Sequence, residues 1–371
     1  MFDIAIIGAG PAGATLARLI GKSYRVLLVD RRRLDLPAEG GRALKPCGGL
    51  LAPAAQRELA RQGLGVPASV LGGPALFGVR TLDIPASLER LYQRHYINVD
   101  RARFDRWLVS QVPDSVEQRH GWSLASLERS ADGAFLRFRT HEGVLVSATA
   151  RLVVGADGAG SLVRRLAFGH IELPKRYVAI QSEHETGRCD PHFGAVFDAR
   201  LTDFYGWTVP KEDRLLAGIA LPGGNTTPGH AAEVHARFLE VLRSAGFSLG
   251  AEIAHSSAPI SRPTSLRQLC PGRDGVLLAG EAAGLISPSS AEGISYALRS
   301  GADLALALDA GIAGVESRYR AAVAPLAARV VLKGAKGAAI YGRMTRRAIM
   351  RSGVAAIGAV EPEFRRAMAA G

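Results

Sequence analysis

The chain has 371 residues, 47% of them hydrophobic, which suffices for one large domain or two ordinary ones around a substantial core. Lys and Arg number 46 against 34 Asp and Glu, but the basic residues are scattered and no nucleic-acid-binding motif accompanies them, which argues against a nucleic-acid partner. The three cysteines, Cys47, Cys189 and Cys270, are far apart, which argues against a disulfide framework or a zinc site and indicates a reducing cytoplasm.

No apolar run reaches the roughly 18 residues that a membrane span requires, and the N-terminus lacks the basic segment of a signal peptide. We therefore expect a cytoplasmic protein, and any contact with a membrane is expected to be peripheral.

The first thirty residues have the pattern of a βαβ unit. Strands are predicted over residues 3–7 and 25–29 and a helix over 14–20, and a Gly-x-Gly-x-x-Gly turn joins the first strand to the helix. In such a turn Gly8 permits a sharp bend, Gly10 lets the backbone approach a pyrophosphate, and Gly13 lets helix and strand pack closely. The helix N-terminus attracts phosphates, and Asp30 is placed to bind ribose hydroxyls. A purely structural turn is the alternative, and the pattern does not separate FAD from NAD.

Two adjacent glycines, Gly48 and Gly49, follow Lys45 and Cys47. They indicate either a backbone that approaches a ligand closely or a simple turn before a helix predicted over residues 53–62.

Strands are then predicted over residues 76–79 and 92–99, and a helix begins at Arg101 with Asp100 as its N-cap. Arg101 is either a solvated surface group or a ligand of the dinucleotide phosphates.

Residues 114–154 alternate as antiparallel strands do and end in a buried strand over 151–154. The turn Gly155-Ala156-Asp157-Gly158 follows, directly before a helix, which favours a second cofactor contact over an ordinary type I turn. The strands predicted next are suited to form one wall of a substrate pocket, and they cover residues 178–183, 193–197, 205–209 and 215–220. An amphipathic helix is predicted over residues 231–245.

A third motif joins a strand predicted over residues 274–279 to a helix predicted over 294–310. Glu281, at the end of the strand, and the following helix N-terminus are suited to hold a polar chain and to place a positive dipole near an electron-rich ring. From residue 316 the chain continues as an Ala- and Arg-rich helical tail. The tail packs on the body or lies at a membrane surface, and the pattern favours packing.

Taken together, the motifs at residues 8–13 with Asp30, at 155–158, and at 280–284 with Pro288 resemble the FAD-dependent oxidoreductases of the p-hydroxybenzoate hydroxylase superfamily. Residues 45–49, 205–211 and 286–294 resemble its geranylgeranyl reductase and CbrA-like branch. The resemblance implies an α/β fold with a Rossmann-like FAD-binding domain of the GR2 type, an inserted antiparallel β-sheet substrate domain and a C-terminal helical tail. The parts expected are an FAD-binding domain in residues 1–75, 97–175 and 262–315, a substrate domain in 76–96 and 176–261, and a helical segment in 316–371.

The resemblance also implies roles for individual residues. The middle motif supports the pyrophosphate region, Arg101 lies near the pyrophosphate, and the third motif grips the ribityl chain, with Glu281 where the family usually has Asp. The residues expected to bind FAD are Gly8, Gly10, Pro11, Ala12, Gly13, Asp30, Arg31, Lys45, Cys47, Gly48, Arg101, Asp157, Gly158, Gly280, Glu281, Pro288, Gly293 and Ile294. No metal site is expected. The expected substrate pocket is lined by Tyr205, Trp207 and Pro210, although the two aromatic residues fit equally well as ordinary core residues.

The implied activity is reduction of carbon–carbon double bonds in an isoprenoid or other lipophilic small molecule, by hydride transfer from reduced FAD with NAD(P)H as the electron donor. The proton is expected from Cys47, or from a water ordered by Glu292 or by the backbone of Gly48 and Gly49, whereas the alternative for Cys47 is a small buried residue.

Two other functions remain open. One is an NAD(P)H-dependent monooxygenase that hydroxylates an aromatic or phenolic lipid, and the other is a non-catalytic FAD-binding regulatory protein.

Overall fold

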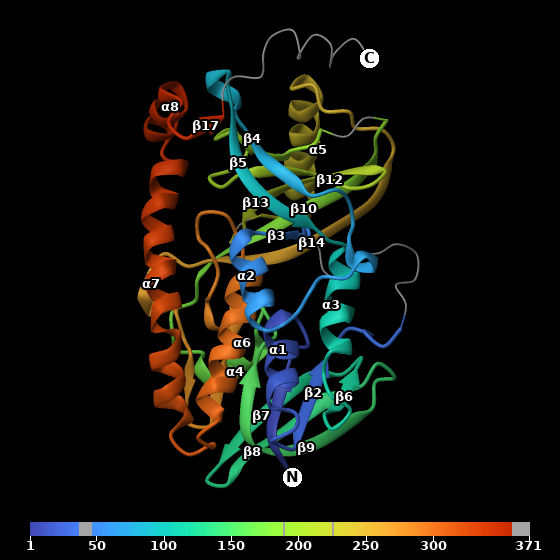
Figure 1. Ribbon diagram of the computed structural model, residues 1–371, viewed down its shortest axis with the longest axis vertical. Coiled ribbons are helices and arrows are strands. Elements are labelled where there is room, and N and C mark those ends of the chain that lie inside the picture. The colour runs from blue at the N-terminus through green and yellow to red at the C-terminus, as the bar shows by residue number, and fades with distance from the viewer. Residues whose placement is uncertain (37–46, 188–189, 225, 358–371) are drawn as a thin grey trace.

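The computed structural model describes residues 1–36, 47–187, 190–224 and 226–357, so Lys45 and Cys189 lie outside the described residues. Two sheets divide the molecule, one in the lower half of Figure 1 and one in the upper half. The predicted α/β fold class, with two sheets and a helical C-terminal region, is confirmed.

The first sheet has a parallel core, in the order β16, β9, β1, β2 and β6. These strands are β1 (Phe2–Ile7), β2 (Val26–Asp30), β6 (Glu117–His120), β9 (Leu145–Gly155) and β16 (Val276–Leu278). Every residue of β2 and of β16 is buried, as expected for parallel strands covered on both faces. An antiparallel extension of β7 (Ser123–Ser130) and β8 (Gly133–Arg139) adds to β9, and β15 (Gly272–Arg273) adds to β16.

Helices lie around this sheet: α1 (Pro11–Ile20), α3 (Arg101–Ser110), α4 (Leu162–Phe168) and α6 (Ile294–Leu308). Helix α2 (Pro53–Arg61) lies next to α6, β3 and β5. Helices α1 and α6 pack very closely, because a Cβ at Gly301 would lie 2.6 Å from the carbonyl oxygen of Ala12. This contact joins the first and third predicted cofactor motifs through their helices.

The second sheet has the order β14, β10, β13, β12, β11, β4, β5 and β17, with β3 attached to β5. Its strands are β3 (Leu50–Leu51), β4 (Leu76–Asp83), β5 (Leu88–Asn98), β10 (Lys175–Glu185), β11 (Phe193–Phe197), β12 (Gly206–Pro210), β13 (Arg214–Pro222), β14 (Glu252–Arg262) and β17 (Ala356–Ile357). All of the pairings are antiparallel except that of β4 with β11.

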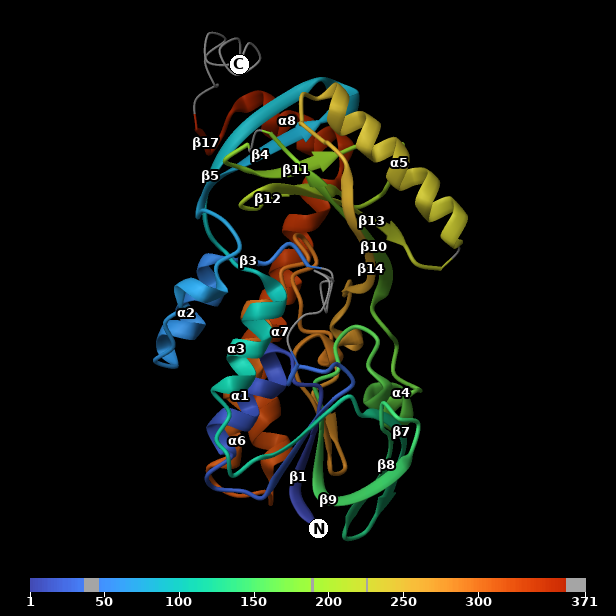
Figure 2. The same ribbon diagram turned by 90° about the vertical axis from the view of Figure 1, so that its right-hand side faces the viewer.

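Helix α5 (Pro228–Ser244) covers one face of this sheet, as Figure 2 shows. Leu215, Ala217 and Ile219 of β13 pack in the cluster under α5, whereas Leu216 and Ala220 belong to an aromatic cluster on the opposite face. Because α5 covers one face, the opposite face is the one that contacts the rest of the molecule.

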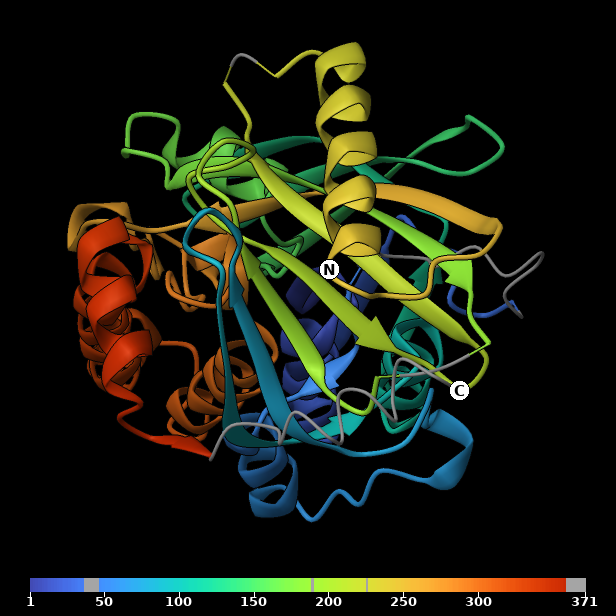
Figure 3. The same ribbon diagram turned by 90° about the horizontal axis from the view of Figure 1, so that it is seen from above.

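Helices α7 (Val315–Tyr341) and α8 (Arg343–Ser352) run along one flank beside both sheets (Figures 1 and 3). The inner side of α7 is buried on the body, and the hydroxyl of Tyr319 donates a 2.9 Å hydrogen bond to the carbonyl oxygen of Leu278. Short 3₁₀ turns complete the described chain: η2 (Ala68–Val70), η3 (Ile84–Ala86), η4 (Leu266–Gln268) and η5 (Gly280–Ala283). Within the described ranges, none of the helices is long and apolar enough to cross a membrane.

Candidate FAD and substrate site

The first glycine turn has the geometry that a dinucleotide site needs. Gly8 has a φ of +107°, and a Cβ there would lie 2.5 Å from the carbonyl oxygen of Ala156. A Cβ at Gly13 would lie 1.9 Å from the carbonyl oxygen of Gly8, so any side chain there would collide with the turn. Both glycines are therefore required by the packing itself.

Gly10 differs from its two neighbours because the space in front of it is open. The nearest atom to a Cβ at Gly10 is the Arg32 Nη2, 4.0 Å away. Gly10 is the N-cap of α1 and no side chain caps that helix, while Pro11 occupies the first turn, where a missing N–H costs nothing. Within the described residues, α1 thus has an uncapped N-terminus beside a glycine with room in front of it, which fits a pyrophosphate.

The three predicted motifs converge around this turn. The Ala156 N–H donates to the carbonyl oxygen of Ile7 at 2.7 Å, and the Ala279 N–H donates to the carbonyl oxygen of Gly155 at 2.9 Å. A Cβ at Gly280 would lie 3.2 Å from the Cβ of Ala12. Segments more than a hundred residues apart therefore form one continuous surface at the ends of β1, β9 and β16.

In the middle motif, residues 155–158, the acid Asp157 is hydrogen-bonded to the residues that directly follow the motif. The carboxylate of Asp157 accepts hydrogen bonds from the Ser161 hydroxyl at 2.6 Å and from the Leu162 N–H at 2.7 Å, so it caps α4. Burial raises the pKa of Asp157, and these hydrogen bonds oppose the shift. Gly158 follows with a φ of +77°. The motif supports the first turn through the backbone of Ala156.

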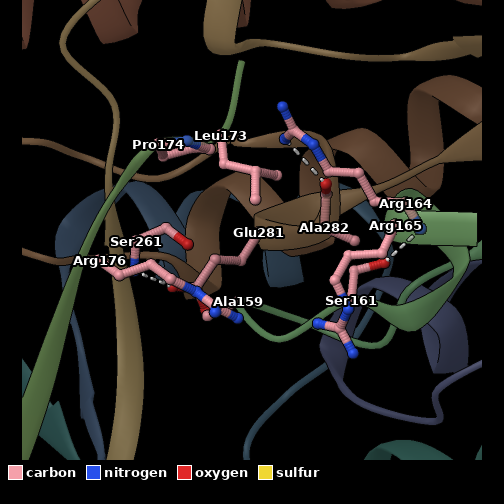
Figure 4. Close-up of a pocket in the computed structure, with 10 residues that line it drawn as sticks. All are labelled: Ala159, Ser161, Arg164, Arg165, Leu173, Pro174, Arg176, Ser261, Glu281 and Ala282. Atoms are coloured by element: carbon pink, nitrogen blue, oxygen red, sulfur yellow. Dashed lines mark hydrogen bonds between the residues drawn. The ribbon is translucent and has the colours of Figure 1, made fainter. Parts of the chain in front are cut away.

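The third motif bends sharply and reaches toward the second sheet. Gly280 has a φ of +59°, and its N–H donates to the Ser300 hydroxyl at 2.8 Å. The Oε1 atom of Glu281 accepts a 2.9 Å hydrogen bond from the Ser261 N–H of β14. Figure 4 shows both residues in a narrow pocket between the second and third motifs, lined in part by Arg164.

The loop after the third motif leads into α6. Pro288 is buried, and its carbonyl oxygen accepts a 3.2 Å hydrogen bond from the Arg262 Nε. Gly293 is the N-cap of α6 and Ile294 its first residue. The carboxylate of Glu292 accepts hydrogen bonds from the Ser295 N–H at 2.8 Å and hydroxyl at 2.7 Å. Glu292 therefore caps the helix, and its expected role in ordering a water stays a prediction.

A chain of alternating charges runs from Asp30 to Arg101. Arg32 donates to Asp30 through Nε at 3.0 Å and Nη2 at 2.9 Å, and to Asp105 through Nη1 at 2.6 Å. Arg101 donates to Asp105 through Nε at 2.7 Å. Burial alone would raise the pKa of Asp105, but Arg101 and Arg32 outweigh it and lower the pKa to about 2.

Asp30 has further partners besides Arg32, since its Oδ2 atom accepts a 2.7 Å hydrogen bond from the Ala9 N–H. Burial raises the pKa of Asp30, but the hydrogen bonds and charge of Arg32 reverse the shift and lower it. Arg31, the expected ligand, is exposed, and Arg32 is the neighbour that contacts Asp30. Sequence reasoning missed Arg32 and Asp105, although Asp105 stands one helical turn after Arg101 and so pairs with it naturally.

The Cys-Gly-Gly loop is fixed by close backbone packing. Gly49 has a φ of +63°, and a Cβ there would lie 2.1 Å from the carbonyl oxygen of Val99. The Gly49 N–H donates to the Cys47 Sγ at 3.5 Å. Burial lowers the pKa of Arg101, but Asp105 and a hydrogen bond with Cys47 outweigh it and hold this pKa above its usual value. The loop and the charge chain are thus one connected structure.

A buried lysine joins this loop to the second sheet. The Lys211 Nζ donates to the Gly48 carbonyl oxygen at 2.9 Å, to the Asn98 Oδ1 at 2.6 Å and to the Val99 carbonyl oxygen at 3.0 Å. The Asn98 Nδ2 donates in turn to the carbonyl oxygen of Pro210 at 2.6 Å. Burial lowers the pKa of Lys211 to about 8. The sequence does contain a signal for this contact, because Lys211 directly follows the buried Trp-x-x-Pro strand and a lysine there needs hydrogen-bond acceptors. We did not use this signal in the prediction of the site.

The expected pocket aromatics lie on the face of the second sheet opposite α5. The hydroxyl of Tyr205 donates a 2.9 Å hydrogen bond to the carbonyl oxygen of Ser290, and its ring lies 5.8 Å from that of Trp207 and 6.5 Å from that of Tyr341 in α7. The Arg262 guanidinium lies 4.3 Å from the centre of the Tyr341 ring. These side chains form a packed aromatic wall next to the Pro288 loop.

Comparison with known proteins agrees with this geometry. Residues 1–180 match the family model of an FAD binding domain. The protein CbrA of Escherichia coli O6:H1 is 38% identical over 359 residues, covering 96% of this chain and 94% of that protein.

Two solved structures share the fold. A geranylgeranyl bacteriochlorophyll reductase-like protein from Thermoplasma acidophilum superposes with a TM-score of 0.77 at 19% identity, over 93% of this chain and 87% of that one. The probable FAD-dependent monooxygenase PqsL from Pseudomonas aeruginosa superposes with a TM-score of 0.69 at 21% identity, over 95% of this chain and 98% of that one.

Proposed function

We propose, from the premise that this chain belongs to the CbrA family within the FAD-dependent oxidoreductases of the p-hydroxybenzoate hydroxylase superfamily, that it reduces carbon–carbon double bonds of an isoprenoid or similar lipid. NAD(P)H is the proposed electron donor. The observation that carries the proposal is the connection of the Cys47–Gly49 loop to the end of β12 through Lys211 and Asn98.

The residues of the first and third motifs would hold the cofactor. The open space at Gly10 and the uncapped N-terminus of α1 suit the pyrophosphate, and the Pro288 loop with the N-terminus of α6 suits the flavin end. When bound, reduced FAD supplies the hydride equivalent that an alkene needs. FAD contact by Arg32 is part of the proposal, because Arg32 lies beside both Gly10 and Asp30.

The second requirement is a proton for the neighbouring alkene carbon. In the proposed reaction the Cys47 thiol gives up its proton as the new C–H bond forms, and solvent later returns a proton to the sulfur. Arg101, which is hydrogen-bonded to Cys47, and Lys211, which holds the next residue, would stabilise the negative charge left on the sulfur. The aromatic wall of Tyr205, Trp207 and Tyr341 would exclude water from an apolar chain.

The proposal is tested under anaerobic conditions with FAD-loaded protein, a chemical reductant and a prenyl lipid, with saturated product detected by mass spectrometry. Cys47→Ala should lose product formation and keep bound FAD. Cys270→Ala is the matched control, because Cys270 is buried in the core of the first sheet. Equal loss in both variants, or full activity of Cys47→Ala, would contradict the assigned role of Cys47.

The second candidate is an NAD(P)H-dependent monooxygenase, which the similarity to PqsL favours. Substrate-coupled oxygen consumption, with a hydroxylated product and no anaerobic turnover, would replace the reductase proposal. Protein that binds FAD and reduces it slowly with every donor would support the non-catalytic alternative instead.

A further inference from the structure

The outer flank formed by α7 and α8 has an unusual charge distribution. Residues 317–357 contain nine Lys and Arg and no Asp or Glu, whereas the chain as a whole has 34 acids in 371 residues. The nine basic residues are Arg318, Arg320, Arg329, Lys333, Lys336, Arg343, Arg346, Arg347 and Arg351. A segment of this length with only one sign of charge sets up a strong local positive potential.

Three of these cations have partners in the body, since Arg347 lies 3.8 Å from Asp83 in addition to the two contacts that follow. Arg318 donates to backbone carbonyl oxygens, among them that of Ala307 at 2.7 Å, and Arg346 pairs with buried Asp83 at 2.8 Å. Five others are exposed and form no ion pair within the described part of the chain: Arg320, Arg329, Lys336, Arg343 and Arg351. Burial lowers the pKa of Lys333, and Arg94 and Lys336 lower it further, as expected where positive charges are crowded.

The same flank exposes large apolar side chains. Leu332 is 70% exposed, Met344 79% and Val354 69%. Val331, Ile349 and Ile357 are also exposed. Large apolar residues on a highly basic helical surface have a free-energy cost in water unless something covers them.

The inner side of α7 is occupied, so the exposed groups point away from the body. Tyr319, Val323 and Val330 are buried against the core, and a Cβ at Gly337 would lie 3.5 Å from Ser289. Figures 1 and 3 show α7 and α8 along one edge of the molecule, with the turn η4 beside α7. The exposed basic and apolar side chains of α7 and α8 therefore lie on the outer side of this flank.

We propose that the outer face of α7 and α8 docks on the surface of an anionic lipid membrane. Leu332, Met344 and Val354 insert among the acyl chains, and the unpaired cations contact lipid phosphates. A second copy of this chain is a poor occupant, because two such flanks would bring like charges together. A polyanion such as nucleic acid would leave the apolar side chains uncovered.

The position of the flank gives this docking a consequence for the site. Tyr341 is the last residue of α7 and its ring belongs to the aromatic wall with Tyr205 and Phe204, while its hydroxyl donates to the carbonyl oxygen of Ser289 at 3.0 Å. Docking would thus place the aromatic wall close to the lipid. The docking proposal stands on charge and exposure and does not depend on which reaction the FAD site performs.

Vesicle co-sedimentation tests the proposal. The purified full-length chain should bind vesicles that contain phosphatidylglycerol, bind vesicles of phosphatidylcholine alone far more weakly, and dissociate as salt is raised. The triple variant Arg329→Gln, Lys336→Gln, Arg343→Gln should lower the partition coefficient roughly a hundred-fold, at about 1 kcal/mol for each charge. Its matched control, with the same loss of charge elsewhere on the exposed surface, is Arg57→Gln, Arg103→Gln, Arg243→Gln.

The apolar contribution has its own variant. The double variant Leu332→Ser, Met344→Ser should lower vesicle binding roughly ten-fold. Leu306→Ser should leave vesicle binding unchanged, because Leu306 is 66% exposed but lies in α6, outside the flank. Bound FAD and thermal stability of every variant establish that it is folded. No binding to anionic vesicles, equal binding to neutral ones, equal loss in the control variants, or a dimer that the flank variants dissociate would each overturn the proposal.

Discussion

The ammonium group of Lys211 donates a 2.9 Å hydrogen bond to the carbonyl oxygen of Gly48, and so connects the second sheet to the loop that carries Cys47. Asn98 completes the connection, because it accepts from Lys211 and donates to Pro210. The position of the thiol therefore depends on a residue that is not itself in the loop.

The first prediction concerns Lys211. Lys211→Met would leave three acceptors without this donor, which costs about 1–3 kcal/mol for each unsatisfied buried group. We expect lower thermal stability, retained FAD and slower alkylation of Cys47, because the loop would be less well fixed and the reacting thiolate would lose a nearby positive charge. Lys22→Met, at an exposed residue, is the control. Unchanged alkylation would exclude a positioning role.

Lys211 also predicts the sign of a pH effect on folding. Its folded-state pKa of about 8 is lower than the unfolded value of about 10.4. The unfolded chain therefore binds more protons between these values, and the contribution of Lys211 to the free energy of unfolding should rise as pH increases from 8 to 10. Comparison of denaturant unfolding of wild type and Lys211→Met across this range measures it. A contribution that falls with pH would contradict the prediction.

The glycine turn predicts two different outcomes for one type of substitution. Gly13→Ala places a Cβ 1.9 Å from the Gly8 carbonyl oxygen and should destabilise the fold by several kcal/mol or prevent folding. Gly10→Ala meets no atom closer than 4.0 Å, so the apoprotein should remain stable while FAD affinity falls. Thermal unfolding and FAD titration separate the two effects. Unchanged FAD affinity in Gly10→Ala would place the pyrophosphate elsewhere.

The low pKa of Asp105 predicts that its contribution to the free energy of unfolding is lost in acid. Its pKa of about 2 lies below the unfolded value of about 3.9, so its contribution is complete above pH 4 and is lost as pH falls toward 2. Asp105→Asn leaves Arg101 and Arg32 without their shared carboxylate and should cost about 3–5 kcal/mol at neutral pH. The difference in free energy of unfolding between Asp105→Asn and wild type should become smaller in acid. Asp114→Asn, at an exposed residue, should have nearly the wild-type free energy of unfolding at either pH. A difference in free energy of unfolding that does not change with pH would contradict the lowered pKa of Asp105.

Shortening Glu281 is expected to lower the stability of the fold and to raise the affinity for FAD. Glu281→Asp is one methylene shorter and should lose the 2.9 Å contact with the Ser261 N–H, at a cost of about 1 kcal/mol. Its carboxylate would then lie closer to the Gly280 turn, where we expect tighter FAD binding. Glu281→Gln keeps the length and serves as the control. FAD affinity and melting temperature are the measurements, and identical affinity in all three proteins would show that this side chain does not reach the cofactor.

The sequence predicted the parts of the fold that have local signals. The buried run before Gly8, the apolar spacing of α1 and the acid at Asp30 are all local, and they lie where the structure has them. Helix α1 begins at Pro11 and not at residue 14, because Pro and small residues suit a first turn but carry no apolar periodicity. Residues 145–155 form one strand, although they were predicted as two runs, because β9 passes from an antiparallel to a parallel neighbour without a break.

Long-range pairings could not be predicted in this way. Nothing local in the sequence indicates that Lys211 meets Gly48, or that Asp105 meets Arg32. Asp157 and Glu292 were interpreted as cofactor or catalytic groups, and in the structure each accepts a hydrogen bond from an N–H group in the first turn of the helix that follows it. The roles of these residues toward FAD stay predictions.

The order of strands in the first sheet also dictates when this protein can mature. Strand β9 lies between β1 and β16, and the last of these, with Gly280 directly behind it, appears only after about three quarters of the 371 residues have left the ribosome. The nascent N-terminal half contains the dinucleotide turn. It lacks β16, which pairs with residues 153–155 of β9, and it lacks α6, which packs on α1. If the third motif holds FAD as proposed, we expect the cofactor to bind late in biosynthesis, and a chain that ends before residue 276 should leave part of β9 unpaired and prone to aggregate.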